Sequence, residues 1–137
     1  MASSTKYLID ASAIYPLILK LREKVLLYED NFVILDLTIY EVGNVVWKEY
    51  QRGKIRDPTS VMKMFEEIMG GVEKLNIGKG MLEIFEIAAK NNITFYDASY
   101  IYIARKRGLK LVTEDHDLLN FPEAISLETM FKELKIQ

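Results

Sequence analysis

The sequence contains no cysteine among its 137 residues, and this absence excludes several kinds of chemistry at once. Disulfides, a cysteine nucleophile and thiolate metal sites are all ruled out. The chain also has a single histidine, His116, so it holds no cluster of imidazoles that could bind a metal ion. A metal site in this protein would therefore be built from oxygen ligands.

Two further absences concern charge and long apolar runs. The 18 Lys and Arg residues against 20 Asp and Glu residues give a net charge of −2, so the chain lacks the overall basic field typical of nucleic-acid-binding proteins. This balance does not exclude a polyanionic substrate, because a local basic strip can guide a strand. No run approaches the ~20 apolar residues of a membrane span. We therefore expect a soluble, cytoplasmic protein with no membrane partner.

The composition is that of a globular protein. Half of the residues are hydrophobic and 28% are charged, which is enough apolar material to bury a core. We see no internal repeat, linker or low-complexity tract, and residues 1–5 form a short polar leader without the apolar core of a signal peptide. We expect one domain over residues 1–137, with residues 1–5 disordered.

Strand and helix patterns alternate along the chain. Apolar, β-type runs at 6–10, 32–35, 72–77, 109–113 and 124–126 predict strands. Stripes of helical periodicity predict helices over 11–29, 38–51, 58–69, 81–91, 96–107 and 127–134. This alternation favours an α/β fold with a mostly parallel sheet covered by helices on both faces.

An acidic residue stands at or just beyond the end of several of these strands. Asp10 ends the first strand, Glu41 follows the second, and Asp115 follows the strand over 109–113. Asp97 lies in the first turn of the helix over 96–107. Ligands of open α/β sheets collect outside the carboxyl ends of the strands. We therefore expect the four carboxylates to converge on one pocket.

Each acid also has a purely structural interpretation. Asp10, Asp97 and Asp115 lie at helix starts, where Asp is a favoured N-cap. Glu41 follows Thr38 in a capping-box pattern. If the four do meet, two carboxylates ~5 Å apart repel by about 3 kcal/mol at an effective dielectric near ~20. Either their pKa values rise or a divalent cation neutralises them, and oxygen-only ligands favour Mg²⁺ or Mn²⁺.

Four short motifs resemble those of the PIN-domain ribonucleases: Leu8-Ile-Asp-Ala-Ser-Ala13, Glu41 with Asn44, Tyr96-Asp-Ala-Ser-Tyr-Ile-Tyr-Ile-Ala104, and Leu111-Val-Thr-Glu-Asp115. The length and compactness are most similar to VapC-type toxins of prokaryotic toxin–antitoxin pairs. The resemblance covers nearly the whole chain and implies a three-layer sandwich with about five strands. It also implies that Asp10, Glu41, Asp97 and Asp115 form the acidic site, with Asp117 as a further candidate.

The resemblance also suggests supporting residues. Ser12 and Thr113 fall where the family often places a hydroxyl that hydrogen-bonds the metal-bound acids or water; helix capping explains them equally well. Asn44 could hydrogen-bond Glu41, although a polar residue at this position can also be merely exposed. His116 receives no role from the resemblance, and a lone histidine among acids on a loop more often faces solvent.

The function implied is a metal-dependent endoribonuclease that cleaves single-stranded RNA. Mg²⁺ or Mn²⁺ would bind a phosphate oxygen and activate a water, which leaves a 5′ phosphate and a 3′ hydroxyl. The most basic stretch lies at the end of the Glu41 helix and supplies the candidate RNA contacts, Lys48, Arg52, Lys54 and Arg56. These four, like the second basic stretch over 105–110, can also be solvated helix ends.

The toxin interpretation further implies a cognate antitoxin that occludes the site and a homodimer. Tyr40 and Trp47 could contribute to the dimer if they lie on the surface instead of in the core. Within the same fold, a housekeeping RNA-processing nuclease without an antitoxin is an alternative. Outside it, a Mg²⁺-binding receiver-like module is disfavoured, because Glu and Asp follow the strand over 109–113 where such modules need Lys. A catalytically silent binding module is the third alternative.

Overall fold

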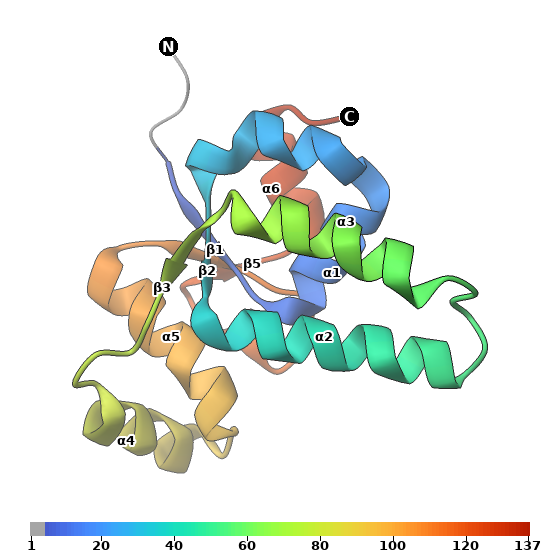
Figure 1. The fold of residues 1–137 in the computed structure, drawn as a ribbon. Helices are drawn as coiled ribbons and strands as arrows, with labels where there is room; N and C mark the ends of the chain where they lie inside the picture. Colours follow the sequence, from blue (N-terminus) through green and yellow to red (C-terminus); the bar gives the residue numbers. More distant parts are fainter. Residues whose placement is uncertain (1–4) are drawn as a thin grey trace.

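The computed structural model describes residues 5–137, in which short strands alternate with helices (Figure 1). Most of the leader expected over residues 1–5 lies outside this range; Thr5 is described, and its carbonyl accepts from Asn31 Nδ2 at 2.9 Å. The elements are β1 (Tyr7–Ile9), α1 (Ala11–Leu21), the 3₁₀ helix η1 (Arg22–Asn31), β2 (Phe32–Leu35), α2 (Asp36–Gln51), α3 (Pro58–Gly70), β3 (Glu73–Leu75), α4 (Met81–Asn91), α5 (Phe95–Arg107), β4 (Lys110–Val112), the 3₁₀ turn η2 (Leu118–Asn120), β5 (Ala124–Ile125) and α6 (Leu127–Leu134).

The strands form one parallel sheet in the order β3-β2-β1-β4-β5, which confirms the predicted sheet of about five strands. The chain adds β2 and β3 on one side of β1 and then returns to add β4 and β5 on the other. The direction of winding therefore reverses between β1 and β4. In open parallel sheets such a reversal opens a crevice outside the carboxyl ends of the two strands.

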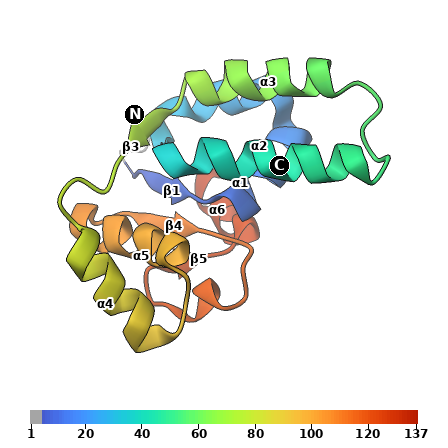
Figure 2. The ribbon, with the colours of Figure 1, turned by 60° about the horizontal axis from the view of Figure 1, so that its bottom comes forward.

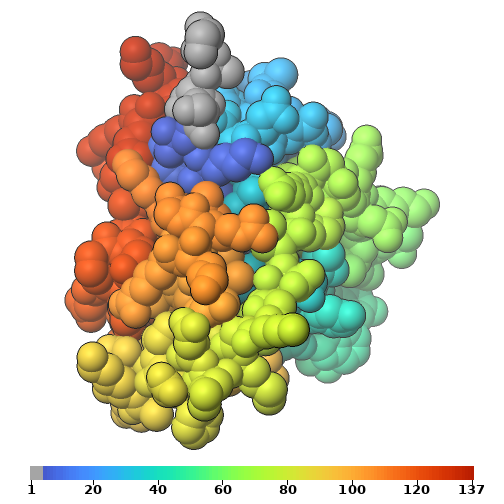
Figure 3. Space-filling view, turned by 90° about the vertical axis from the view of Figure 1, so that its left-hand side faces the viewer, coloured from blue at the N-terminus to red at the C-terminus, as the bar shows by residue number. Residues whose placement is uncertain are grey.

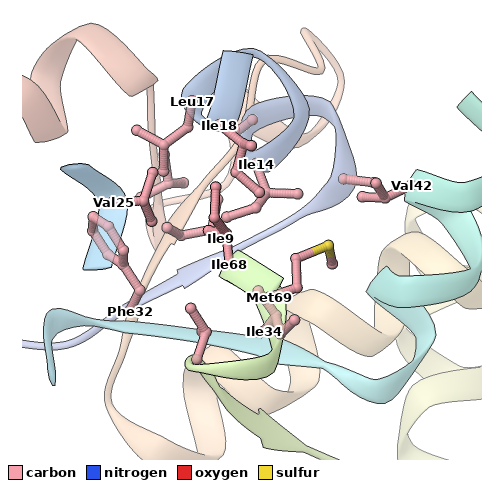
Figure 4. Close-up of a cluster of buried hydrophobic side chains, with 14 of the residues drawn as sticks. Ile9, Ile14, Leu17, Ile18, Val25, Phe32, Ile34, Val42, Ile68 and Met69 are labelled. Atoms are coloured by element: carbon pink, nitrogen blue, oxygen red, sulfur yellow. The ribbon is translucent and has the colours of Figure 1, made fainter. Parts of the chain in front are cut away.

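Helices cover both faces of the sheet, so the predicted three-layer sandwich is confirmed. Alternate strand side chains point to opposite faces: Ile9 packs among residues of α1, α3 and α6, whereas Leu8 packs among residues of α5. Figures 1 and 2 show α4 and α5 on one side and α1 and α3 on the other. Figure 4 shows part of the hydrophobic cluster around Ile9, to which Ile14 of α1 and Ile34 of β2 also belong.

One predicted helix is wrong in its extent. The pattern over residues 11–29 predicts a single helix, but α1 ends at Leu21 and Arg22 turns to a positive φ of 51°. The chain then continues as η1. The inward-facing positions of η1, Val25, Tyr28 and Asn31, lie three residues apart, which suits a 3₁₀ helix with three residues per turn.

No helix within residues 5–137 has both the length and the apolar character needed to cross a bilayer.

Pro16 lies in the second turn of α1, one turn deeper than the position where a proline is free of cost.

Candidate active site

The four predicted acids lie at the carboxyl edge of the sheet. Asp10 directly follows β1 and Asp115 lies in the loop after β4, so the two flank the point where the winding reverses. Glu41 lies in the second turn of α2, which follows β2, and Asp97 lies in the first turn of α5. Residues far apart in sequence are thus gathered on one side of the molecule.

The carboxylates affect one another's ionisation in a chain that links all four. The charge of Glu41 acts on Asp10, that of Asp97 acts on Glu41, and that of Asp115 acts on Asp97. Asp117 also acts on Asp97, from the exposed rim of the site. The structure therefore brings the predicted acids into one electrostatic group.

Asp10 is the most deeply buried acid of the group, with 5% of its surface exposed. Burial raises its pKa to about 6, against the opposing effect of the hydrogen bonds it accepts, and the charge of Glu41 adds to the rise. Burial also raises the pKa of Glu41, opposed by a hydrogen bond from Tyr100, and the charge of Asp97 adds to this shift. Burial and mutual repulsion therefore make the ionised forms of Asp10 and Glu41 unfavourable.

Asp97 shows the same behaviour. Burial raises its pKa first, the charge of Asp115 raises it further, and the hydroxyl of Thr94 opposes the rise. Thr94, not Asp97, is the N-cap of α5: its hydroxyl accepts from the Asp97 N–H at 3.0 Å. The N-cap interpretation of Asp97 is therefore wrong, and its carboxylate is not needed to begin the helix.

The hydroxyls of Ser12 and Thr113 hydrogen-bond the carboxylate of Asp10. Ser12 Oγ donates to Asp10 Oδ1 at 2.6 Å and lies 3.2 Å from Thr113 Oγ1. Ser12 Oγ also accepts from the Glu114 N–H at 2.9 Å, and Thr113 Oγ1 accepts from the Asp115 N–H at 3.0 Å. The first turn of α1 and the loop after β4 are thereby tied together through the two residues singled out from the sequence. Asp10 itself also caps α1, because Oδ1 accepts from the Ala13 N–H at 3.1 Å.

Asp115 and its neighbours form a turn at the same edge. Asp115 Oδ1 accepts from the N–H of Asp117 at 2.8 Å and from that of Leu118 at 3.4 Å. This carboxylate therefore does begin a short turn, as the capping interpretation proposes. His116 lies between the two acids and is exposed.

Glu41 is held by Tyr100, which Thr38 supports in turn, and sequence reasoning missed both residues. The Tyr100 hydroxyl donates to Glu41 Oε1 at 2.5 Å and lies 2.7 Å from Thr38 Oγ1. The capping-box interpretation of Glu41 is wrong, because α2 begins at Asp36 and Thr38 Oγ1 accepts from the Leu35 N–H at 3.1 Å. One sequence signal could have found the pair: each hydroxyl lies one helical turn from an acid, Thr38 before Glu41 and Tyr100 after Asp97.

The remaining predicted residues make none of the hydrogen bonds or ion pairs found at the four acids within residues 5–137. Asn44 is exposed, and no hydrogen bond joins it to Glu41 in the described range. The basic stretch occupies the last turn of α2 and the loop beyond it: Lys48, Arg52, Lys54 and Arg56. Lys48 follows Glu41 by seven residues, or about 10 Å along the helix axis at the usual rise. Glu49 binds Arg52 at 2.9 Å and Lys54 at 3.8 Å.

The chemistry of the donor set fits a hard divalent cation. All of the donors are carboxylate oxygens. A cation bound between them would offset their mutual repulsion and the cost of burying their charged forms, which together raise their pKa values. As the side chains lie, however, no group of three or more Asp, Glu or His residues within 5–137 is close enough together to hold a metal ion. Binding would therefore require the carboxylates to draw closer.

Comparison with known proteins gives the family. The model described as "PIN domain" matches residues 7–124. The chain belongs to the PIN-domain family. The matched range includes Asp10, Glu41, Asp97 and Asp115, together with the two hydroxyl residues that support Asp10.

This PIN domain is similar to two proteins of Pyrobaculum aerophilum. It is 37% identical over 133 residues to the protein named Exonuclease VapC9, covering 96% of this chain and 98% of the relative. It is 32% identical over 130 residues to Ribonuclease VapC3, covering 88% of this chain and 98% of that protein. The family resemblance inferred from the four motifs is thus confirmed.

Solved structures show the same fold. The crystal structure of PAE2754 from Pyrobaculum aerophilum superposes with a TM-score of 0.87 at 36% identity, covering 99% of this PIN domain and 93% of that chain. A chain of a toxin–antitoxin complex from Klebsiella pneumoniae superposes with a TM-score of 0.64 at 14% identity, covering 89% and 98%. The second likeness shows the fold alone.

Proposed function

We propose that this PIN-domain protein is a metal-dependent endoribonuclease that cleaves single-stranded RNA and is the toxin of a toxin–antitoxin pair. The observation that carries the proposal is the grouping of Asp10, Glu41, Asp97 and Asp115 at the carboxyl edge of the sheet. No Lys or Arg is among the charges that shift the pKa values of the first three. The names of the two relatives, an exonuclease and a ribonuclease, support nuclease chemistry.

In this proposal the four carboxylates hold Mg²⁺ or Mn²⁺, with Asp117 as a further candidate ligand. When bound, the ion neutralises a phosphate oxygen and lowers the pKa of a water. The chain's own hydroxyls serve the carboxylates: Ser12 and Thr113 fix the position of Asp10 through neutral hydrogen bonds, which add no competing positive charge. Asn44 remains a candidate support for Glu41.

The candidate RNA contacts lie at the far end of α2, which extends past the sheet, and in the loop that follows it (Figures 1 and 2). Glu49 partly neutralises Arg52 and Lys54, whereas Lys48 and Arg56 take part in none of the ion pairs found within residues 5–137. We propose that these exposed cations guide the phosphate backbone of a single strand toward Glu41.

We also propose a homodimer and a cognate antitoxin, both acting in the cytoplasm. Tyr40 and Trp47 are 77% and 52% exposed, so they are surface residues of α2 and not core residues. On the other flank, α4 forms the lower edge of the face shown in Figure 3 and exposes Met81, Leu82 and Phe85. Large exposed apolar side chains of this kind mark surfaces that partners cover. An antitoxin that also reaches the acids would block the site.

The test is cleavage of a pool of single-stranded RNA by purified protein in Mg²⁺, in Mn²⁺ and in EDTA, with Asp97→Asn alongside. We expect cleavage in one or both metal ions, none in EDTA, and little by the variant. Labelling the RNA at its 5′ end and, separately, at its 3′ end distinguishes internal cuts from exonucleolytic shortening. Cleavage that persists in EDTA or in Asp97→Asn would contradict the proposal.

Two further measurements, co-purification of a partner and Mn²⁺ binding, separate the alternatives when they are combined with the cleavage experiment. A protein that cleaves RNA but co-purifies with no small partner, when expressed with its neighbouring reading frames, is a housekeeping RNA-processing nuclease. A protein that binds Mn²⁺ but leaves single-stranded RNA intact is a non-catalytic metal-binding module.

A further inference from the structure

We propose that Tyr100, acting with Thr38, is a positioning residue that sets the orientation of the Glu41 carboxylate. This inference rests on the proposed function, because it concerns how Glu41 is presented to a metal ion. The two residues come from different helices, α5 and α2, and are 62 positions apart in sequence, so only the fold brings them together.

The hydrogen bonds run in one direction. Tyr100 has a single hydroxyl proton and donates it to Glu41 Oε1 at 2.5 Å. Because that proton is used, Thr38 must be the donor in its 2.7 Å contact with the Tyr100 oxygen. Thr38 Oγ1 in turn accepts from the Leu35 N–H at 3.1 Å, at the end of β2. Each bond in the series therefore polarises the next toward the carboxylate.

The network goes beyond what burial of Tyr100 requires. Tyr100 is 1% exposed and Thr38 is fully buried, so each hydroxyl needs a partner, and they already provide one for each other. The bond to Glu41 is an additional one. Within residues 5–137, Tyr100 is the only residue that donates a hydrogen bond to Glu41. One carboxylate oxygen is thus fixed and Oε2 remains for a ligand.

The same contact links two of the acids. Tyr100 lies one turn after Asp97 on α5, and Thr38 lies one turn before Glu41 on α2. A bond from Tyr100 to Glu41 therefore ties the helix that carries one acid to the helix that carries the other. Its loss would free the Glu41 side chain to rotate without removing a charge from the site.

The test compares Tyr100→Phe with a matched control, Tyr7→Phe, in Mn²⁺ affinity measured by calorimetry and by the electron paramagnetic resonance signal of free Mn²⁺. Tyr7 is also buried, and its hydroxyl also donates to a glutamate, Glu133, at 2.8 Å. It lies at the opposite end of β1. We expect Tyr100→Phe to weaken Mn²⁺ binding by roughly 10–100-fold, the usual cost of losing a partner of a metal ligand. Tyr7→Phe should leave the affinity unchanged.

A second readout separates positioning from general destabilisation. The Mn²⁺ concentration for half-maximal cleavage should rise in Tyr100→Phe, while saturating Mn²⁺ restores most of the rate. Thr38→Ser, which keeps the hydroxyl, should bind Mn²⁺ more tightly than Thr38→Val, which lacks it. This pair decides the question even if Tyr100→Phe does not fold.

The outcomes are distinct. Wild-type protein that binds no Mn²⁺ overturns the proposed function, and this inference with it. Wild-type protein that binds Mn²⁺, with equal affinity in Tyr100→Phe or in Thr38→Val, overturns the positioning role alone. Melting curves without metal, recorded for every variant, show whether a change in affinity accompanies unfolding.

Discussion

The two ends of the parallel sheet each carry a tyrosine that donates a hydrogen bond to a glutamate, yet the two ends differ in charge. At the amino end, Tyr7 bonds Glu133, and Lys110 Nζ lies 3.0 Å from both carboxylate oxygens of that glutamate. The pKa of Glu133 is lowered, first by its hydrogen bond with Lys110 and then by that with Tyr7. This is an ordinary surface ion pair.

At the carboxyl end, Tyr100 bonds Glu41, but the charges that act on Glu41 and its neighbours are all negative. The pKa values of Asp10, Glu41 and Asp97 are raised instead of lowered, with burial as the largest cause in each case. Similar hydrogen bonds therefore accompany opposite electrostatics. An end that gathers buried and half-buried acids is unfavourable for stability and suited to binding a cation.

The largest expected effect is on cleavage. Asp10→Asn should lower the cleavage rate at least about 100-fold, since even outer partners of metal ligands cost up to that much. Asn keeps the cap on α1, so folding should survive. Glu133→Gln, at the other end of the sheet, should leave the rate unchanged. Initial rates on a labelled RNA measure the cleavage rate of each variant. An equal loss of rate in Asp10→Asn and Glu133→Gln would contradict the contrast between the two ends of the sheet.

The pH dependence of stability in metal-free protein should show the cost of ionising Asp10 at the carboxyl end of the sheet. Because the pKa of Asp10 is raised to about 6, the folded state holds its proton more tightly than the unfolded chain does. Stability should therefore fall as pH rises from about 4 to about 6, by at most about 3 kcal/mol at 1.36 kcal/mol per pKa unit.

Urea denaturation at pH 4.5 and pH 7 measures this change. Asp10→Asn should flatten it, and added Mn²⁺ should recover stability at pH 7. A metal-free protein that becomes more stable between these pH values would contradict the assignment of Asp10 as a strained carboxylate.

A smaller contrast concerns the two glutamates in metal-free protein at pH 7. Glu41→Gln removes a negative charge from an acidic group, so its melting temperature should rise. Glu133→Gln removes an ion pair that is partly exposed, and exposed pairs contribute about 0–1 kcal/mol, so its melting temperature should fall slightly or stay unchanged. Scanning calorimetry of both variants gives the two signs. A fall for Glu41→Gln would remove the contrast.

The smallest effect is expected in the basic stretch. Lys48→Gln with Arg56→Gln should weaken RNA binding by a few-fold at low salt and reduce its salt dependence, because each contact with a phosphate releases about one counterion. Lys110→Gln, a cation of the amino end that is occupied by Glu133, is the matched control. Fluorescence anisotropy in EDTA with Asp97→Asn protein, which we expect not to cleave, measures affinity.

Much of the fold follows from local patterns. The strand run at 32–35, Phe-Val-Ile-Leu, is apolar throughout because both faces of a parallel sheet are covered. Asp10 and Asp115 stand just after β1 and β4, where the chain leaves those strands. Where prediction failed, the missing information was tertiary. The stripe from Leu21 to Tyr28 fits an α-helix as well as a 3₁₀ helix, and the two share inward-facing positions over such a short stretch.

The sequence by itself determined the α/β class and the family motifs that contain the acids, since these depend on periodicity and on residues close together in the chain. Only the tertiary structure decided the strand order, the reversal of winding between β1 and β4, and the bond from Tyr100 to Glu41. Side chains 59 residues apart meet because two helices pack on one sheet. The one-turn spacing of each hydroxyl from an acid marks Thr38 and Tyr100 in the sequence, but it does not show that Tyr100 reaches Glu41. Burial likewise exists only in the folded chain, so the raised pKa values of the acids do as well.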